Sequence, residues 1–313
     1  MKIKYESVKF DQWKLDMIEE VNSIVRRYKA QGYNLSLRQV YYQFVSRDLL
    51  PDRWSDKATG STNNERSYKN LGNLISDGRM GGLIDWNAIE DRTRELTSPS
   101  HWDSPASIIE AIAEQYAIDK WSDQKVRIEV WVEKDALEGV VARPCEKLDI
   151  AYFSCRGYPS MTALHDAGMR LKKYVQEGQD VVVLDFHDHD PSGIDMTRDA
   201  TDRLTLFMGP EARGLDVRRM ALNMNQIQQY SPPPNPAKIT DSRAEAYIQK
   251  YGASSWELDA LDPTVIDKLI TDEVLKIRDD KKYQYKQNQE DNEKDLLQQC
   301  SDRWTDVQEF LEE

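Results

Sequence analysis

Apolar residues recur at helical spacing in three stretches near the start of the chain. The pattern predicts amphipathic helices over 10–31, 36–50 and 65–75. The second stretch has Ser36 and Gln39 at the two positions of a capping box, which indicates where that helix starts. A glycine-containing turn follows the third stretch. Three helices followed by a hairpin or wing predict a winged-helix-like domain.

From about residue 125 the pattern changes to short apolar runs, each followed by a helical pattern. The predicted strands cover 126–132, 150–154, 181–186 and 215–222. The predicted helices cover 135–148, 159–177 and 192–207. Strands that alternate with helices are typical of a parallel sheet, so this region is expected to have an α/β fold.

The chain is expected to fold as three regions. Residues 1–100 are the predicted winged-helix-like DNA-binding domain, and residues 101–230 are the predicted parallel-sheet domain. The boundary between these two regions is placed at 98–105. Residues 231–313 form the third region, a proline-rich arm followed by a helical carboxyl-terminal part.

Charge and composition narrow the classes of function. The net charge is −13, yet residues 1–80 carry 14 Lys and Arg against 10 Asp and Glu. A basic amino-terminal region still permits nucleic-acid binding through one face. No run of about 18 apolar residues predicts a membrane span, and the polar first ten residues do not resemble a secretory signal. Three widely spaced cysteines favour a reducing, cytoplasmic location.

Carboxylates follow two of the predicted strands. Asp188 and Asp190 come just after the strand at 181–186, and Glu133 follows the strand at 126–132. Open α/β sheets bind ligands at the carboxyl ends of their strands, and clustered carboxylates favour a cation. Oxygen ligands suit Mg²⁺, so the three residues are predicted to hold that ion. For the Asp-His-Asp segment alone, an acidic loop that caps the next helix is the alternative.

The second predicted helix places a tyrosine beside an arginine. Tyr41 falls on the apolar face, whereas Arg38 and Tyr42 are neighbours on the flank, four residues apart. Tyr41 is therefore expected in the core and Tyr42 at the surface. A guanidinium next to a phenol suits an attack on a phosphate. Ordinary surface packing is the alternative for this pair.

Further basic side chains are candidates for phosphate contacts. Arg66, Lys69 and Arg79 lie on or near the third predicted helix, and Arg156 lies in a turn before a later helix. A solvated charged face is the alternative for the first three.

Four short segments occur in an order that resembles a known family. They are Leu37-Arg38-Gln39-Val40-Tyr41-Tyr42, Glu133-Lys134, Arg156-Gly157-Tyr158-Pro159 and Asp188-His189-Asp190-Pro191-Ser192-Gly193. Together they resemble the winged helix and Toprim domain of the topoisomerase VI A subunit and its meiotic double-strand-break relatives. The resemblance covers residues 36–196 and does not extend to the carboxyl-terminal third.

The resemblance implies Mg²⁺-dependent DNA cleavage in which Tyr42 becomes covalently attached to DNA. It implies that Arg38 assists at the scissile phosphate, that Glu133 takes part in catalysis as well as in metal binding, and that Lys134 and Arg156 contact nucleic acid. The family site is completed across a homodimer, so Tyr42 and Asp188 of one chain are expected to lie well apart.

Three features depart from the family pattern. Arg156 replaces the lysine of the family, and the strand before the aspartate pair carries the additional Asp185 and His187. The chain has no ATPase module, so complete topoisomerase activity would require a separate ATPase subunit.

Two other functions remain alternatives to the tyrosine transesterase. One is a hydrolytic Toprim nuclease, in which the metal activates water and Tyr42 only packs or touches DNA. The other is a DNA-binding or assembly protein that does not cleave. A covalent protein–DNA adduct distinguishes the first function from both alternatives.

Overall fold

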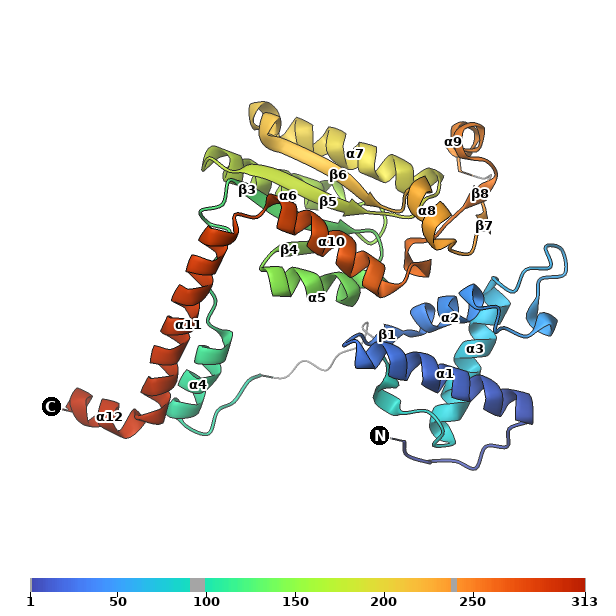
Figure 1. Cartoon of the computed structure of the whole chain (residues 1–313), viewed down its shortest axis with the longest axis horizontal. Helices are drawn as coiled ribbons and strands as arrows, with labels where there is room; N and C mark the ends of the chain where they lie inside the picture. Colours follow the sequence, from blue (N-terminus) through green and yellow to red (C-terminus); the bar gives the residue numbers. More distant parts are fainter. Residues whose placement is uncertain (1, 91–98, 238–240, 313) are drawn as a thin grey trace.

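The computed structural model describes residues 2–90, 99–237 and 241–312 (Figure 1). The α-helices among these residues are α1 (Gln12–Ala30), α2 (Leu37–Ser46), α3 (Glu65–Met80), α4 (Pro105–Gln115), α5 (Glu138–Leu148), α6 (Met161–Gln176), α7 (Pro191–Met208), α8 (Met224–Tyr230), α9 (Ala244–Tyr251), α10 (Pro263–Ile277), α11 (Asp280–Asp302) and α12 (Trp304–Glu312). The strands are β1 (Leu35–Ser36), β2 (Ile89–Glu90), β3 (Val126–Val132), β4 (Ala151–Ser154), β5 (Asp180–Phe186), β6 (Leu215–Ala221), β7 (Asn235–Pro236) and β8 (Ser254–Ser255).

The first three helices pack around one apolar core and form the first of two bodies. Ser36 and Gln39 form the predicted capping box, with each side chain bonding the other residue's backbone N–H, and α2 starts at the next residue. β1 and β2 pair in parallel over two residues each. No antiparallel hairpin follows α3 in residues 81–90, so the wing of a winged helix is not confirmed. The boundary expected at 98–105 begins in residues that lie outside the description.

A four-stranded parallel sheet forms the second body, in the order β4-β3-β5-β6. Its alternate residues face two different cores. Ile128, Val130 and Val132 pack with α5 and α10, whereas Val181 and Val183 pack with α6 and α7. Because helices cover both faces, β5 is apolar on both sides. The predicted α/β fold with a parallel sheet and a helical carboxyl-terminal part is confirmed; the Toprim assignment is not.

The carboxyl-terminal helices take different positions. α10 lies beside α5 on one face of the sheet, whereas α11 extends away from the sheet with α4 packed along it (Figure 1). Lys120 and Glu290 of α11 form a buried ion pair of 2.6 Å. Across the described ranges, no helix is both long and apolar enough to cross a membrane.

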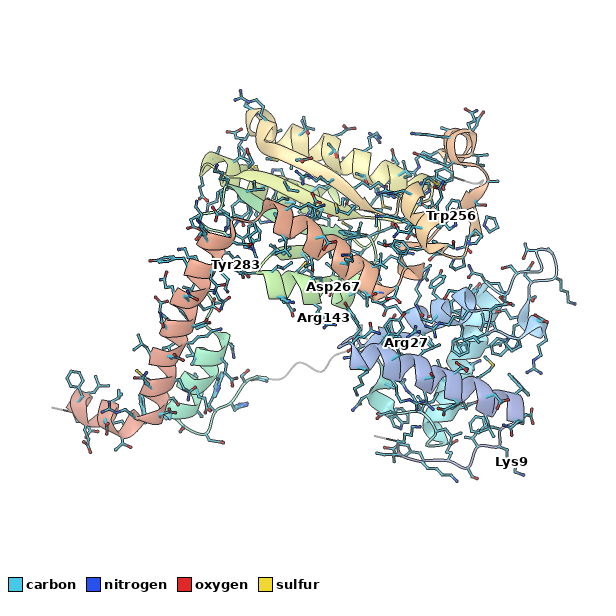
Figure 2. All side chains as sticks on the ribbon, in the orientation of Figure 1. Lys9, Arg27, Arg143, Trp256, Asp267 and Tyr283 are labelled. Atoms are coloured by element: carbon cyan, nitrogen blue, oxygen red, sulfur yellow. The ribbon has the colours of Figure 1, made fainter. Side chains whose placement is uncertain are left out.

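Polar contacts join the amino-terminal helices to the sheet domain. The Tyr28 hydroxyl donates to Asp262 at 2.6 Å, and the Tyr33 hydroxyl donates to Asp267 at 2.8 Å. Arg143 on α5 donates to a backbone carbonyl just after α1. Figure 2 shows Arg143 and Asp267 on the side of the sheet domain that faces these helices. The contacts hold α2 close to the carboxyl edge of the sheet.

Candidate functional site

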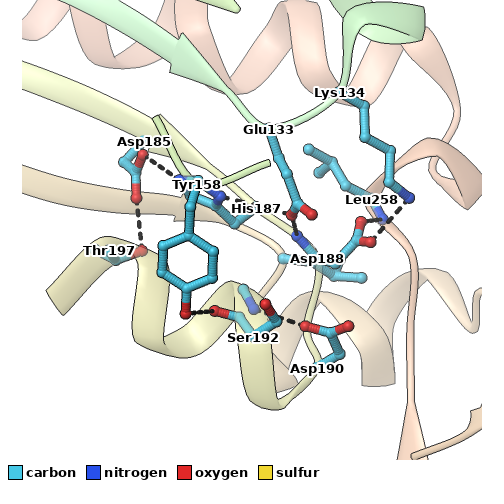
Figure 3. A network of polar contacts seen from close by, with 12 residues as sticks. Glu133, Lys134, Tyr158, Asp185, His187, Asp188, Asp190, Ser192, Thr197 and Leu258 are labelled. Carbon is cyan, nitrogen blue, oxygen red and sulfur yellow. Dashed lines mark hydrogen bonds and ion pairs between the residues drawn. The ribbon is translucent and has the colours of Figure 1, made fainter. Parts of the chain in front are cut away.

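The carboxyl ends of β3 and β5 bring the first two predicted metal ligands together. The strands are parallel neighbours, with Val132 opposite Phe186, so Glu133 and the segment after β5 emerge side by side. The backbone N–H of Asp188 donates to Oε2 of Glu133 at 2.9 Å (Figure 3). Pairing of β3 with β5 thus brings Glu133 and Asp188 together although 55 residues separate them, as predicted.

Asp190 lies two residues further on and caps α7. Its Oδ1 accepts the Gly193 N–H at 2.6 Å. Asp190 therefore makes the helix-capping contact that was the alternative to metal binding for this segment. Gly193 has a steric role of its own. A Cβ added there would lie 2.2 Å from the Asp188 carbonyl oxygen. The loop at residues 187–190, called the aspartate loop below, can pack this closely against α7 only because residue 193 has no side chain.

Arg219 on β6 donates hydrogen bonds to the same loop. It was not among the residues predicted from the sequence. One terminal nitrogen donates to the Gly193 carbonyl at 2.8 Å, and the other donates to the Asp188 carbonyl at 2.7 Å. Burial lowers the pKa of Arg219, while the nearby carboxylates, including Glu133 and Asp190, oppose that change. Only the strand order places this arginine under the loop, so no local sequence signal marks it.

The two residues that depart from the family pattern form a buried chain behind Glu133. His187 Nε2 lies 2.7 Å from Asp185 Oδ1, and its Nδ1 lies 3.6 Å from Glu133 Oε2. Asp185 is held on its other oxygen by the Thr197 hydroxyl at 2.6 Å. Burial favours the neutral ring, but the carboxylates of Asp185 and Glu133 outweigh it and raise the pKa of His187 to about 9. His187 thus lies between the carboxylates of Asp185 and Glu133.

Lys134 lies at the centre of a second cluster of carboxylate side chains. Its Nζ is 2.8 Å from Asp188 Oδ2, 2.8 Å from Glu257 Oε2 and 3.1 Å from Asp259 Oδ1. Burial opposes its charge, yet these carboxylates raise the pKa of Lys134 well above its ordinary value. Leu258 donates its backbone N–H to Asp188 Oδ1 at 2.7 Å. The segment 257–259 is thereby attached to the aspartate loop.

Arg38 and Tyr42 contact the same acidic segment from the α2 side. Arg38 Nε donates to Asp259 Oδ2 at 2.5 Å, and its terminal nitrogen bonds Glu257. Tyr42 and Glu257 line the same cavity, and Arg38 lies 5.6 Å from the centre of the Tyr42 ring. Burial and then Asp259 and Glu257 raise the pKa of Tyr42. Tyr42 is 4% exposed, so its predicted surface position is wrong: the flank of α2 is covered by the carboxyl-terminal segment.

This arrangement also changes the expected separation of Tyr42 and Asp188. Within one chain, Tyr42 lines a cavity with Glu257, the Glu257 carboxylate contacts Lys134, and Lys134 contacts Asp188. The two residues were expected to lie well apart, which is not what the structure shows. The contacts between the two bodies bring them together, and a motif pattern carries no information about that packing.

Tyr41 is buried, as predicted from the helical pattern. Its hydroxyl is not an inert part of the core. It accepts the backbone N–H of Asn64 at 2.8 Å and lies 3.1 Å from Oδ1 of Asn63. Tyr41 thus anchors the loop that leads into α3, a role distinct from that of Tyr42.

The other predicted phosphate contacts differ in their surroundings. Arg66 and Lys69 are exposed on α3, and Lys69 pairs with Glu65 at 2.7 Å. Arg79 donates to the carbonyls of Trp86 and Ile89, so its guanidinium supports the chain after α3.

Arg156 is largely exposed and pairs with Asp135 at 3.1 Å. The next residue, Gly157, donates its N–H to the Glu133 carbonyl, so this turn lies beside the carboxylate site.

The donor set suits Mg²⁺ in chemical type. Glu133, Asp188 and Asp190 supply hard oxygens, and neither Oε1 of Glu133 nor Oδ2 of Asp190 takes part in a hydrogen bond among the described residues. Their present arrangement is less open, because Lys134 contacts Asp188 Oδ2. Within those same ranges, no group of three or more Asp, Glu, His or Cys side chains is arranged to hold a metal ion.

Glu257 and Asp259 are the functional candidates that sequence reasoning missed. They alternate with the apolar residues Trp256, Leu258 and Leu261, of which Leu258 and Leu261 are buried. The acidic residues between them are the signal that was available. A cavity of about 260 Å³ lies beside them, lined in part by Tyr42, Arg38 and Glu257.

The chain was compared with known protein families, curated proteins and solved structures. No protein-family model, curated protein or solved structure matches the chain.

Proposed function

We propose that this protein cleaves DNA by phosphoryl transfer, with Tyr42 as the nucleophile, as its resemblance to the topoisomerase VI A subunit implies. One observation carries the proposal: Arg38, which lies 5.6 Å from the centre of the Tyr42 ring, is joined to Lys134 and Asp188 through the carboxylate of Glu257. A phenol, two cations and a carboxylate edge within one small region are the parts that this reaction needs.

In the proposed reaction, the Tyr42 oxygen attacks the phosphorus in line and displaces a deoxyribose oxygen. Arg38 and Lys134 bind the phosphoryl oxygens once a phosphate replaces their present carboxylate partners. Glu133, Asp188 and Asp190 would hold Mg²⁺, which would offset negative charge on the phosphate. The tyrosyl ester preserves the energy of the broken bond, so the strands can be rejoined. Cutting both strands would use two copies, hence a homodimer, and complete topoisomerase activity would use a separate ATPase subunit.

A hydrolytic nuclease is the second candidate, and the burial of Tyr42 favours it. A phenol that is 4% exposed, on a helix covered by the segment 257–259, reaches a phosphate only after that segment moves. The carboxylates at the sheet edge require no such movement to act on a water molecule. The two candidates share the acidic site and differ in whether Tyr42 takes part.

Plasmid cleavage with Mg²⁺ tests both candidates. Each reaction is divided and run on gels with and without protease treatment before loading. A transesterase leaves DNA that enters the gel only after protease treatment, because the protein stays attached to a DNA end. A hydrolytic enzyme gives the same products in both halves.

Two variants identify the residues responsible. Tyr42→Phe abolishes cleavage by a transesterase and leaves a hydrolytic enzyme active, whereas Asp188→Ala inactivates both. Cleavage that persists in Tyr42→Phe without a covalent adduct rules out the nucleophile. If the protein binds DNA but cuts it at no Mg²⁺ concentration tested, both enzymatic functions are contradicted. The protein is then a DNA-binding protein that does not cleave.

A further inference from the structure

We propose that the arm formed by α4, α11 and α12 is a dimerisation surface, and that its partner is the arm of a second copy of this chain in antiparallel orientation. The arm comprises residues 105–115 and 280–312. It extends away from the sheet domain on the side opposite to the carboxyl ends of the strands (Figure 1). The inference therefore does not depend on DNA cleavage, and it gives a homodimer a location.

Apolar side chains on the arm are exposed to solvent. None of the described residues of α12 is buried, and Phe310 and Leu311 on this helix are 75% and 71% exposed. Leu296 on α11 is 61% exposed. A hollow of about 320 Å³ lies where α11 meets α12, and Leu296, Val307 and Phe310 are among the residues that line it. Exposed apolar groups gathered around a hollow are typical of a protein–protein contact, whereas isolated ones are not.

The charges of the arm are divided along its length. Residues 281–289, at the end next to the sheet domain, contain three lysines and no acidic residue. Residues 291–312, toward the far end, contain seven acidic residues and two basic ones, a balance of −5. α4 lies beside this acidic part, where the Ser301 hydroxyl donates to the Ala106 carbonyl at 2.9 Å. The near end of the arm is therefore positive and the far end negative.

This division of charge indicates what the arm binds. A negative far end repels the phosphates of a nucleic acid, so DNA does not fit there. A two-fold dimer brings the same surface of two chains together, and every contact in it occurs twice. In an antiparallel pair, the negative end of each arm lies beside the positive end of the other. A parallel pair would place like charges together. Since charges along paired helices set their orientation, a second copy in antiparallel orientation is the partner that fits.

The exposed side of α11 offers contacts along most of its length. The helix has 23 residues and is therefore about 35 Å long. Tyr285, which is 69% exposed, lies among the lysines of the positive end. Eleven residues, or about three helical turns, separate Tyr285 from Leu296, so the two side chains lie on the same side of α11. An antiparallel partner can thus cover the aromatic ring at one end and the apolar hollow at the other.

Sedimentation equilibrium of the full chain, from about 1 µM to about 100 µM, tests the proposal. The variants are Phe310→Asp and, as a matched control, Leu206→Asp. Leu206 is 74% exposed on α7, so it is as accessible as Phe310 but lies outside the arm. Circular dichroism and thermal unfolding establish that each variant is folded.

We expect wild type to sediment at twice the 36.4 kDa of one chain. Phe310→Asp places a charge within the apolar contact, so it should raise the Kd of the dimer by about tenfold or more. Leu206→Asp should leave this Kd unchanged.

Charge reversal tests the antiparallel orientation. One variant combines Lys281→Glu with Lys286→Glu, which makes both ends of the arm negative. The other combines Asp302→Lys, Asp306→Lys and Glu309→Lys, which makes both ends positive. Each variant alone should associate more weakly than wild type, because like charges then meet in either orientation. An equimolar mixture should recover the dimer, since every negative end then finds a positive partner.

Other results overturn the proposal, and none of them depends on DNA, because the assay contains none. Wild type that remains monomeric over the whole concentration range excludes the dimer. A Kd unchanged by Phe310→Asp, or raised equally by Leu206→Asp, excludes the arm as its specific surface. A mixture of the charge variants that associates no better than either alone excludes the antiparallel pairing. If Phe310→Asp is unfolded, Leu296→Asp replaces it and is judged by the same criterion.

Discussion

The ammonium of Lys134 lies 2.8 Å from Oδ2 of Asp188 and neutralises that carboxylate. The same ammonium contacts Glu257 and Asp259. A single half-buried side chain thus links the carboxylate edge of the sheet to the acidic segment that covers α2. The stability of this region depends on these contacts, and under the proposed function so would the access of a DNA phosphate to Arg38 and Lys134.

Lys134→Met is expected to destabilise the protein by about 3–5 kcal/mol, because it leaves buried carboxylates facing one another without a cation. Urea unfolding at neutral pH measures the loss. The double variant Lys134→Met with Asp259→Asn should recover part of it, since one of the unpaired charges is then removed. Equal stability of the single variant and wild type would show that the ion pair is open in solution.

Mixing Tyr42→Phe with Asp188→Ala tests whether one chain carries a complete site. The contacts that join these residues within a chain predict that mixed dimers do not recover cleavage, because each chain lacks one component. A site shared across the dimer predicts recovery in one of the two mixed sites. Plasmid cleavage by verified mixed dimers, compared with each parent, separates the two arrangements.

Tyr41→Phe and Tyr42→Phe are expected to differ in what they lose. Tyr41→Phe leaves the buried N–H of Asn64 without an acceptor and should cost about 1–3 kcal/mol of unfolding free energy. It should leave the chemistry of any cleavage reaction unchanged. Tyr41→Ala removes the whole buried ring and should cost about 3–5 kcal/mol. Tyr42→Phe should retain its packing and lose covalent adduct formation. Thermal unfolding and the adduct assay, performed on each variant, compare the two positions.

Gly193→Ala is expected to disrupt the aspartate loop although alanine favours helices. Its Cβ would lie 2.2 Å from the carbonyl oxygen of Asp188, a distance that the backbone must relieve by moving. We expect a lower melting temperature and loss of cleavage. Ser192→Ala, one position earlier, is the control and should change neither strongly. A Gly193→Ala protein as stable and active as wild type would contradict the close packing of this loop.

Alkaline pH should loosen the contact between the two bodies. Burial and then the bond to Asp262 raise the pKa of Tyr28 to about 12, against an ordinary value of 10.0. A folded pKa above the unfolded one contributes stability that is complete below the unfolded pKa. That contribution should be lost as the pH rises from about 10 to about 12.

Tyr28→Phe is the matched variant for this pH dependence. It removes a hydrogen bond to a carboxylate, so it should be less stable at neutral pH by about 1.5–3 kcal/mol. Its stability should then fall less steeply above pH 10 than that of wild type. Denaturant unfolding across this range measures both; parallel curves for the two proteins would assign the pH dependence to other groups.

The sequence by itself determined the local elements and one part of the site. β-branched runs on β3 and β5 can be buried on both faces only in a sheet covered by helices, so the parallel arrangement followed from their pattern. The convergence of Glu133 and Asp188 followed as well, because carboxyl ends of neighbouring parallel strands meet at one edge. The start of α2 was fixed by Ser36 and Gln39, whose capping interaction is local.

Only the tertiary structure decided the exposure of Tyr42 and the partners of Lys134 and Arg38. Helical periodicity separates the faces of α2 but does not say what covers each face. Glu257 and Asp259 reach that face from more than 200 residues away, through packing between the two bodies. Long-range contacts of this kind depend on the shape and charge of assembled surfaces, and no short stretch of the chain encodes them.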